Sequence, residues 1–157
     1  MTVDEFFAGV CREMGWTPTP WRIAVFSFWA GRESVGQLFT RARNPLATTW
    51  ETPDTPLDLT FSIGHGRGHW NSVPVKVYAS YEAGIRATAY TLKLGHYENI
   101  RRCFRDQRGY QEAVGPKDFT TWIGPDTQYG QAVVDFMNGT TASRGDEEMA
   151  TDLRWRR

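Results

Sequence analysis

The fold is best predicted from residues 21–33, which read WRIAVFSFWAGRE. From Trp21 to Ala30 nearly every residue is apolar, and the apolar positions surround a helix instead of forming one stripe along it. Thr19 is suited to cap the start of this helix, and Pro20 is suited to its first position. We therefore expect a central, buried helix that ends in Gly31-Arg32-Glu33.

Other helices are predicted on both sides of this central one. Thr2 and Glu5 have the spacing of a capping box, which indicates a helix that starts at the N-terminus. That first helix is expected to end at Gly15. The other predicted segments are a third helix capped by Ser80 that reaches Gly95, a basic fourth helix over residues 97–107, a short turn over residues 118–122, and a last helix capped by Asp126 that ends before Gly139. Tyr129 is among the residues of this last helix that are expected to point inward.

The stretch between the second and third helices has a different character. Prolines and glycines punctuate residues 43–78, so no long helix is expected there. The runs Leu57–Phe61 and Val73–Tyr78 alternate in polarity and predict a small hairpin. The predicted fold class is therefore α+β and mostly helical, with a small irregular β-containing lobe between the second and third helices. We expect residues 1–139 to form this domain and residues 140–157 to form a polar, loose tail.

Composition sets limits on the function. The chain has 157 residues, 40% apolar and 14% aromatic, which is enough to bury one core. Eighteen basic residues balance eighteen acidic ones, which argues against a protein that coats nucleic acid. The longest apolar stretch, Ile23 to Gly31, is too short to cross a bilayer. Cys11 and Cys103 are too few for a disulfide framework and are expected to be buried thiols.

Glu33 is the first candidate for chemistry, because it is a carboxylate placed where an apolar helix stops. A carboxyl group beside Phe28 and Trp29 is partly desolvated, which raises its pKa and lets it hold a proton near neutral pH. A general acid needs this property. The alternative is an ordinary solvated carboxylate at a helix end.

Glu33 and two segments that follow it occur in an order that is typical of a known protein family. Glu33 is followed by a short loop and then by Asn44-Pro45-Leu46-Ala47-Thr48-Thr49, and residues 70–85, WNSVPVKVYASYEAGI, come further on. This arrangement resembles the lysozyme-like superfamily, in particular its glucosaminidase-type and phage-associated peptidoglycan hydrolases. The resemblance covers residues 3–105. It departs from many lytic transglycosylases in lacking their Gly-Leu-Met-Gln-like segment, and residues 51–69 fall outside the family pattern.

The resemblance implies a lysozyme-like domain that cleaves a β-1,4 bond of the peptidoglycan glycan, as a muramidase or a glucosaminidase. It implies Glu33 as the catalytic acid, and it requires no cofactor and no metal. Bacterial peptidoglycan is the implied partner, with other virion tail proteins beside it, and neither nucleic acid nor membrane is expected. The substrate-binding residues that we infer are Asn44, Thr48, Thr49, Trp70, Tyr78 and Glu82.

A second catalytic group is not marked by the sequence. The candidate carboxylates are Glu51, Asp54, Asp58 and Glu82. One that lies close to Glu33 would permit a retaining route, and one farther away an inverting route. If neither is present, the N-acetyl group of the substrate can act as the nucleophile, with Tyr78 orienting it. We favour this last, substrate-assisted interpretation.

Three other patterns suggest alternatives. His65 and His69 flank a glycine-rich loop, but two imidazoles without an obvious third ligand fall short of a zinc site. Arg67 and Trp70 in the same stretch are expected to contact sugar. The basic residues Arg86, Lys93, Arg101, Arg102, Arg105 and Arg108 suit either an anionic surface or an ordinary solvated face. Trp50, Trp70 and Trp122 are the tryptophans best suited to stack on sugars.

The biological setting follows from the same reasoning. The acidic N-terminus does not read as a signal peptide, so we expect synthesis in the cytoplasm. Action at the bacterial cell wall would then follow assembly into a virion or release through a membrane pore, which favours a phage origin. The competing hypothesis is a non-catalytic virion structural or wall-binding protein that keeps a lysozyme-like fold.

Overall fold

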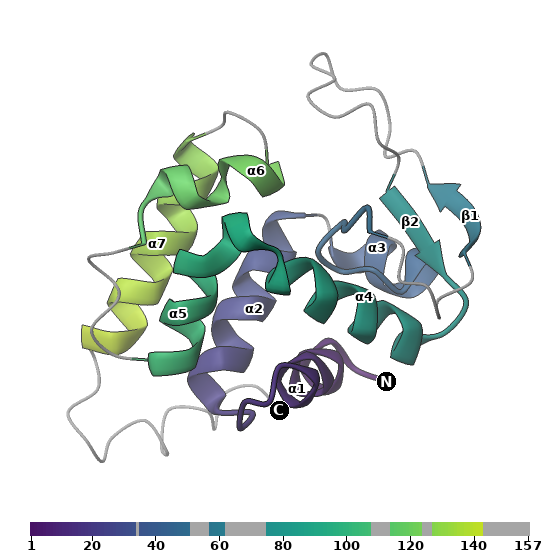
Figure 1. The fold of residues 1–157 in the computed structure, drawn as a ribbon, viewed down its shortest axis with the longest axis horizontal. Coiled ribbons are helices and arrows are strands. Elements are labelled where there is room, and N and C mark those ends of the chain that lie inside the picture. The colour runs from purple at the N-terminus through teal and green to yellow at the C-terminus, as the bar shows by residue number, and fades with distance from the viewer. Residues whose placement is uncertain (34, 51–56, 62–74, 108–113, 124–126, 143–157) are drawn as a thin grey trace.

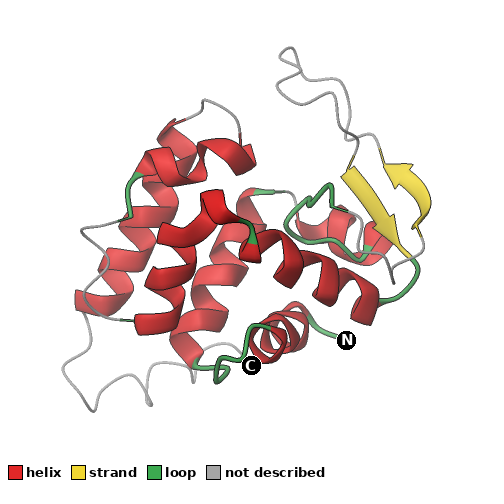
Figure 2. Cartoon of the chain, viewed as in Figure 1, coloured by secondary structure: helices red, strands yellow, loops and turns green. Residues whose placement is uncertain are grey.

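The structure is a computed structural model that describes residues 1–33, 35–50, 57–61, 75–107, 114–123 and 127–142. Helices dominate the described residues, and one two-stranded sheet lies at one end of the molecule (Figures 1 and 2). The prediction of a mostly helical α+β chain is thus confirmed. No helix in this part of the chain combines the length and apolar character that crossing a membrane requires.

The first two helices, α1 (Val3–Glu13) and α2 (Pro20–Arg32), begin as their sequences predict. The Thr2 hydroxyl accepts the N–H of Glu5, and the Glu5 carboxylate accepts the N–H of Thr2 at 2.6 Å, which completes the capping box. Thr19 caps α2 by accepting the N–H of Arg22. The turn after α1 contains Gly15 with a φ of +73°, a conformation that glycine adopts without steric cost.

Helix α3 (Val35–Ala42) corrects the sequence analysis, which placed only a short loop between Glu33 and Asn44. Leu38, Phe39 and Ala42 are buried on one face of α3. Their spacing is helical, but a helix of eight residues that contains Gly36 has little intrinsic stability and depends on this packing. The β-containing lobe therefore follows a third helix, and not the second.

The hairpin and the next helix are confirmed. Strands β1 (Leu57–Phe61) and β2 (Val75–Tyr78) pair antiparallel, with a register shift between Leu57 and Leu59. Helix α4 (Tyr81–Lys93) begins immediately afterwards, capped by the Ser80 hydroxyl, which accepts the N–H of Ala83 at 3.1 Å. Val73 and Pro74, which the predicted second strand included, lie outside the described residues.

The last helices complete the helical part. The predicted fourth helix is a 3₁₀ turn, η1 (Gly95–Tyr97), followed by α5 (Glu98–Asp106). The predicted short turn is η2 (Pro116–Phe119) with α6 (Thr120–Ile123). Helix α7 (Thr127–Ala142) continues beyond Gly139, where the sequence analysis ended it. Asp126, its predicted cap, and residues 143–157 of the predicted tail lie outside the described residues.

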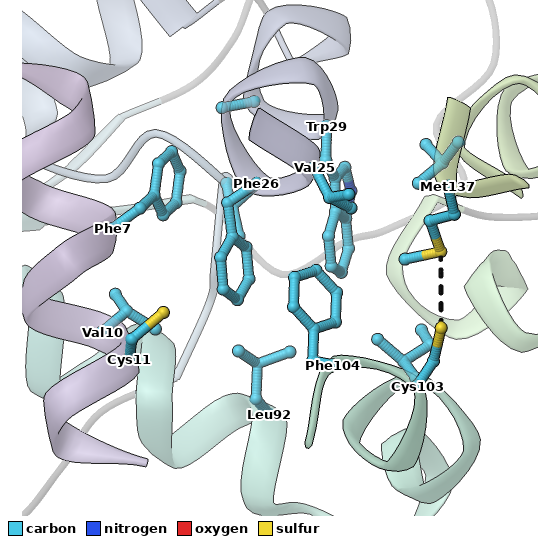
Figure 3. Packing of buried hydrophobic residues seen from close by; sticks show 14 of the residues in the cluster. Phe7, Val10, Cys11, Val25, Phe26, Trp29, Leu92, Cys103, Phe104 and Met137 are labelled. Atoms are coloured by element: carbon cyan, nitrogen blue, oxygen red, sulfur yellow. Dashed lines mark hydrogen bonds between the residues drawn. The ribbon is translucent and has the colours of Figure 1, made fainter. Parts of the chain in front are cut away.

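Helix α2 lies at the centre of the core, between α1 and α7 (Figures 1 and 3). The Phe26 ring stacks on Phe104 with centroids 4.2 Å apart and on Phe7 with centroids 5.0 Å apart. Cys11 and Cys103 are buried free thiols, as expected, and burial raises the pKa of each to about 11. The Cys103 thiol faces Met137 of α7 (Figure 3).

Two features of packing fix how the helices meet. Arg22 of α2 is buried, and its guanidinium donates to the carbonyl oxygens of Phe104 and Arg105 at 2.7 Å, at the C-terminal end of α5. Gly84 of α4 faces the segment after α3: a Cβ there would lie 2.1 Å from the Arg43 carbonyl oxygen. The first contact joins the start of α2 to α5, and the second joins α4 to the segment after α3.

Candidate active site

Glu33 is the C-cap residue of α2, and its N–H donates to the Ala30 carbonyl oxygen at 2.9 Å. Its side chain is half-buried. Its partner is Tyr129 of α7, whose hydroxyl donates to Glu33 Oε1 at 2.5 Å. The same hydroxyl lies 3.3 Å from the Trp29 carbonyl oxygen. A phenol has one proton, so the shorter contact, to Glu33, is the principal hydrogen bond.

Two opposing effects act on the Glu33 carboxyl group. Burial removes water from the charged form and raises the pKa of Glu33, while the hydrogen bond from Tyr129 lowers that pKa. Burial is the larger effect, so the pKa of Glu33 lies above its ordinary value. Burial, and then the charge of Glu33, also raise the pKa of Tyr129, which therefore stays a hydrogen-bond donor. The sequence prediction of a desolvated carboxyl group at this position agrees with this geometry.

Aromatic side chains also mediate contacts between α2 and α7. The Arg32 guanidinium lies over the Tyr129 ring, 5.5 Å from its centroid. Phe28 stacks on Phe136 of α7 with centroids 4.2 Å apart. The sequence analysis predicted Tyr129 as an inward residue of the last helix but not as the partner of Glu33. Only its inward position was readable, because no local pattern pairs residues on two distant helices.

The segment after α3 holds Asn44 and Thr48 away from solvent. Asn44 Nδ2 donates to the carbonyl oxygens of Thr48 and Lys76 at 2.8 Å each, and Asn44 Oδ1 accepts the N–H of Thr48. Asn44 is fully buried and Thr48 is 3% exposed. The inference that these two side chains contact substrate is therefore corrected: the Asn44 side chain joins the segment to β2, and the Thr48 hydroxyl pairs with Thr91 of α4. Thr49, the third inferred residue of this segment, is half-buried.

The backbone of this segment is strained. Arg43 and Ala47 have φ angles of +52° and +56°, in a region that residues with a Cβ rarely occupy. Each such residue costs about 1–3 kcal/mol and persists only where surrounding contacts enforce it. Asn44 lies between these two residues in the sequence, and the hydrogen bonds of its side-chain amide supply contacts of this kind.

Tyr78 and Glu82 differ in their surroundings. Tyr78 is fully buried, and its hydroxyl donates to the Trp50 carbonyl oxygen at 2.7 Å, so it is not free to orient a substrate. This corrects the role inferred for it. Glu82 is exposed in the first turn of α4, where hydrogen bonds from its own N–H and from Ser80 lower the pKa of its carboxyl group. Glu82 is therefore an ionised carboxylate that complements the N-terminus of α4.

Trp122 connects the end of α2 to the segment after α3. Its indole Nε1–H donates to the Leu46 carbonyl oxygen at 2.7 Å. Its ring packs edge-on against Trp29, one helical turn before Glu33, with centroids 4.9 Å apart. This tryptophan, which the sequence suggested for sugar stacking, thus holds residues 44–50 against the helix that carries Glu33.

Several sequence candidates are not placed by the structure. The residues that lie outside the described part are Glu51, Asp54, His65, Arg67, His69, Trp70 and Arg108; Asp58 belongs to β1, and its side chain is not described. Within the described ranges, no three histidine, cysteine or acidic side chains lie together as metal ligands would.

Two of the basic residues singled out above stabilise helix ends. Lys93 Nζ donates to the Glu13 carbonyl oxygen at 3.2 Å, and Arg101 donates to the Lys93 carbonyl oxygen at 2.6 Å. Cations at these positions complement the C-terminal dipoles of α1 and α4. Arg101 also pairs with Glu98. These contacts give part of the basic surface a structural role.

The fold and the site together define a mostly helical α+β chain with a half-buried, tyrosine-bonded carboxyl group at the end of its central helix. Comparison with known proteins finds no family model, no curated protein and no solved structure that matches this chain.

Proposed function

We propose that this chain is a glycoside hydrolase with a lysozyme-like fold that cleaves a β-1,4 bond of the peptidoglycan glycan, with Glu33 as its general acid. The observation that carries the proposal is the state of Glu33. Its carboxyl group is half-buried at the end of α2, its pKa is raised by burial, and Tyr129 holds one of its oxygens. The resemblance of residues 3–105 to lysozyme-like peptidoglycan hydrolases names the substrate.

The proposed reaction begins with proton transfer from Glu33 to the glycosidic oxygen. As the bond between that oxygen and the anomeric carbon breaks, positive charge develops on the sugar ring. Tyr129 can keep donating to Glu33 after the proton has left, so the carboxylate that forms is stabilised. The ionised Glu33 is then available to accept a proton from the attacking water.

The group that stabilises the sugar ring is proposed to be the substrate itself. Glu82 is an exposed, ionised carboxylate in the first turn of α4, and none of its described contacts involves Glu33. We retain the substrate-assisted route that the sequence analysis favours, in which the carbonyl oxygen of the N-acetyl group attacks the anomeric carbon as the leaving oxygen departs. Water then attacks the anomeric carbon and gives its proton to Glu33, while the bond from the N-acetyl oxygen to that carbon breaks and the N-acetyl group is restored in the second product.

The setting that we propose is a phage-encoded enzyme, associated with the virion or released as an endolysin. The resemblance supports this setting, because the families concerned include phage-associated hydrolases. Bacterial peptidoglycan is the proposed partner.

The test compares the wild-type chain with Glu33→Gln on purified sacculi, with glycan fragments detected by mass spectrometry. General acid catalysis contributes about 10²–10⁴ in rate, so Glu33→Gln is expected to release fragments at least about a hundredfold more slowly. Glu13→Gln is the control, because Glu13 is an exposed glutamate at the end of α1. The masses of the fragments identify the bond that is cut.

Two outcomes would overturn the proposal. One is that the wild-type chain releases no fragments, and the other is that Glu33→Gln releases them as fast as the wild type. If the wild-type chain binds sacculi without releasing fragments, the protein is a non-catalytic wall-binding protein instead.

A further inference from the structure

Tyr90 of α4 is unusually exposed among the aromatic residues that the structure describes. It is 41% exposed, whereas the other aromatic side chains whose burial the structure describes are buried or half-buried. Its ring stacks on that of Trp50, with centroids 4.9 Å apart and planes 17° from parallel. The two rings therefore form an aromatic stack that reaches the surface of the molecule.

The backbone of Trp50 is held from both sides. Its carbonyl oxygen accepts the Tyr78 hydroxyl at 2.7 Å, and its N–H donates to Thr48 Oγ1 at 3.4 Å. Thr48 and Tyr78 are two of the residues that the resemblance suggested as substrate contacts. Their side chains instead fix the position of Trp50.

A chain of hydroxyl groups extends this support to α4. The Thr91 hydroxyl donates its proton to the Ala87 carbonyl oxygen at 2.8 Å. Thr91 Oγ1 must therefore accept the proton of Thr48, whose oxygen lies 2.6 Å away. The buried network thus anchors the segment that carries Trp50 to the helix that carries Tyr90, and it orders the stack before any ligand binds.

The stack also belongs to the same structural unit as Glu33. Trp122 donates to the Leu46 carbonyl oxygen and packs against Trp29 near the end of α2, so it links the segment that carries Trp50 to the helix that Glu33 caps. A glycan strand is a long ligand, and it can contact an acid and an aromatic surface at different sugars.

We propose that the stack of Trp50 and Tyr90 is a binding platform for one sugar of a β-1,4-linked N-acetylhexosamine strand, an inference that rests on the proposed function. The face of an aromatic ring is electron-rich, and the C–H face of a pyranose presents hydrogens of partial positive charge to it. A rigid tyrosine loses little conformational entropy on binding. The ordered stack therefore gives a sugar an aromatic surface without the cost of arranging it.

The test measures binding of a soluble hexamer of β-1,4-linked N-acetylglucosamine by titration calorimetry. All variants carry Glu33→Gln, so that turnover does not consume the ligand. Tyr90→Ala and Tyr90→Leu are expected to weaken binding about threefold to tenfold, because both remove the aromatic face. Tyr90→Phe keeps the ring and is expected to bind within twofold of the parent. Equal thermal unfolding midpoints would show that the fold is intact.

The platform is overturned if Tyr90→Ala and Tyr90→Leu bind as the parent does, or if Tyr90→Phe loses as much affinity as they do. It is also overturned if the parent binds neither the hexamer nor purified sacculi. The two proposals fail separately. Loss of binding in Tyr90→Ala, together with wild-type chain that releases no glycan fragments, would leave the platform and remove the catalytic role of Glu33.

Discussion

Glu33 and Tyr129 form the pair of residues on which the proposed chemistry depends. Burial and the tyrosine hydrogen bond act on the pKa of Glu33 in opposite directions, and burial dominates. Burial alone would favour the protonated form of the Glu33 carboxyl group but would leave its orientation unfixed. The Tyr129 hydroxyl holds one carboxyl oxygen at 2.5 Å, which leaves the other oxygen to carry the proton toward a substrate.

Tyr129→Phe tests this balance. The change removes the hydrogen bond that lowers the pKa of Glu33, so that pKa should rise further above its ordinary value. A general acid works while it is protonated, and its activity falls as the pH rises through its pKa. The alkaline limb of the pH profile of sacculus cleavage should therefore move to higher pH in Tyr129→Phe. An unmoved limb, or one moved to lower pH, would contradict the assignment.

At the residue scale, the sequence identified Glu33 but not its partner. The features that indicate Glu33 are local: an apolar helix, its end, and a carboxylate there. Tyr129 lies on another helix, and its hydrogen bond to Glu33 depends on how α7 packs against α2. For the same reason, Asn44, Thr48 and Tyr78 were assigned to substrate when their side chains in fact support the segment around Trp50.

Among the elements, α4 depends on a close approach that only glycine permits. Gly84→Ala would place a Cβ 2.1 Å from the Arg43 carbonyl oxygen, so α4 or the segment after α3 must move. We expect Gly84→Ala to reduce the free energy of unfolding by about 1–3 kcal/mol, despite the higher helix propensity of alanine. Chemical denaturation measures this change.

Gly36→Ala in α3 is the matched control. A Cβ at Gly36 meets no atom within 4 Å, and the residue is exposed. It should increase the free energy of unfolding by about 0.4–1 kcal/mol through the lower entropy of the unfolded chain. If both variants change the free energy of unfolding in the same direction, the contact of a Cβ at position 84 with the Arg43 carbonyl oxygen does not determine the stability of Gly84→Ala.

Elements with strong caps were the most predictable. Thr2, Thr19 and Ser80 each cap the helix that the sequence assigned to them. Helix α3 was missed because it is short and is stabilised by burial of Leu38 and Phe39, a tertiary effect. The end of α7 was placed too early because Gly139 suggested a C-terminal cap, whereas the helix continues through it.

At the scale of the whole molecule, Arg22 joins the central helix to α5. Its guanidinium donates to the carbonyl oxygens of Thr17, Phe104 and Arg105, and the residue is only 5% exposed. Arg22→Met leaves these acceptors without their donor, so the free energy of unfolding should fall by about 2–4 kcal/mol. The free energy of unfolding of Arg22→Lys should lie between those of the wild type and Arg22→Met, because an ammonium group cannot match the planar, forked donors of a guanidinium.

Thermal unfolding checks this prediction, with Arg12→Met as the control. Arg12 is an exposed arginine in the last turn of α1. If Arg22→Met and Arg12→Met unfold at similar temperatures, the buried guanidinium does not hold α2 and α5 together.

The arrangement of the whole molecule was only partly predictable. The apolar content of residues 21–30 indicated a central helix, and α2 is the centre of the core. The contacts that assemble the candidate site join residues far apart in the chain, such as Trp122 with Leu46 and Tyr129 with Glu33. A single sequence contains no periodic signal for such pairs, because they arise from the packing of complete elements.

The central claim is that Glu33 keeps its proton at a pH where an ordinary glutamate is ionised. The most direct measurement is the ¹³C chemical shift of the Glu33 carboxyl carbon as a function of pH, in the full chain with labelled glutamate. The signal is assigned by its absence in Glu33→Gln. We predict a titration midpoint above the ordinary glutamate pKa, because burial outweighs the Tyr129 hydrogen bond. A midpoint at or below the ordinary value would show an ionised carboxylate and contradict the role of Glu33 as a general acid.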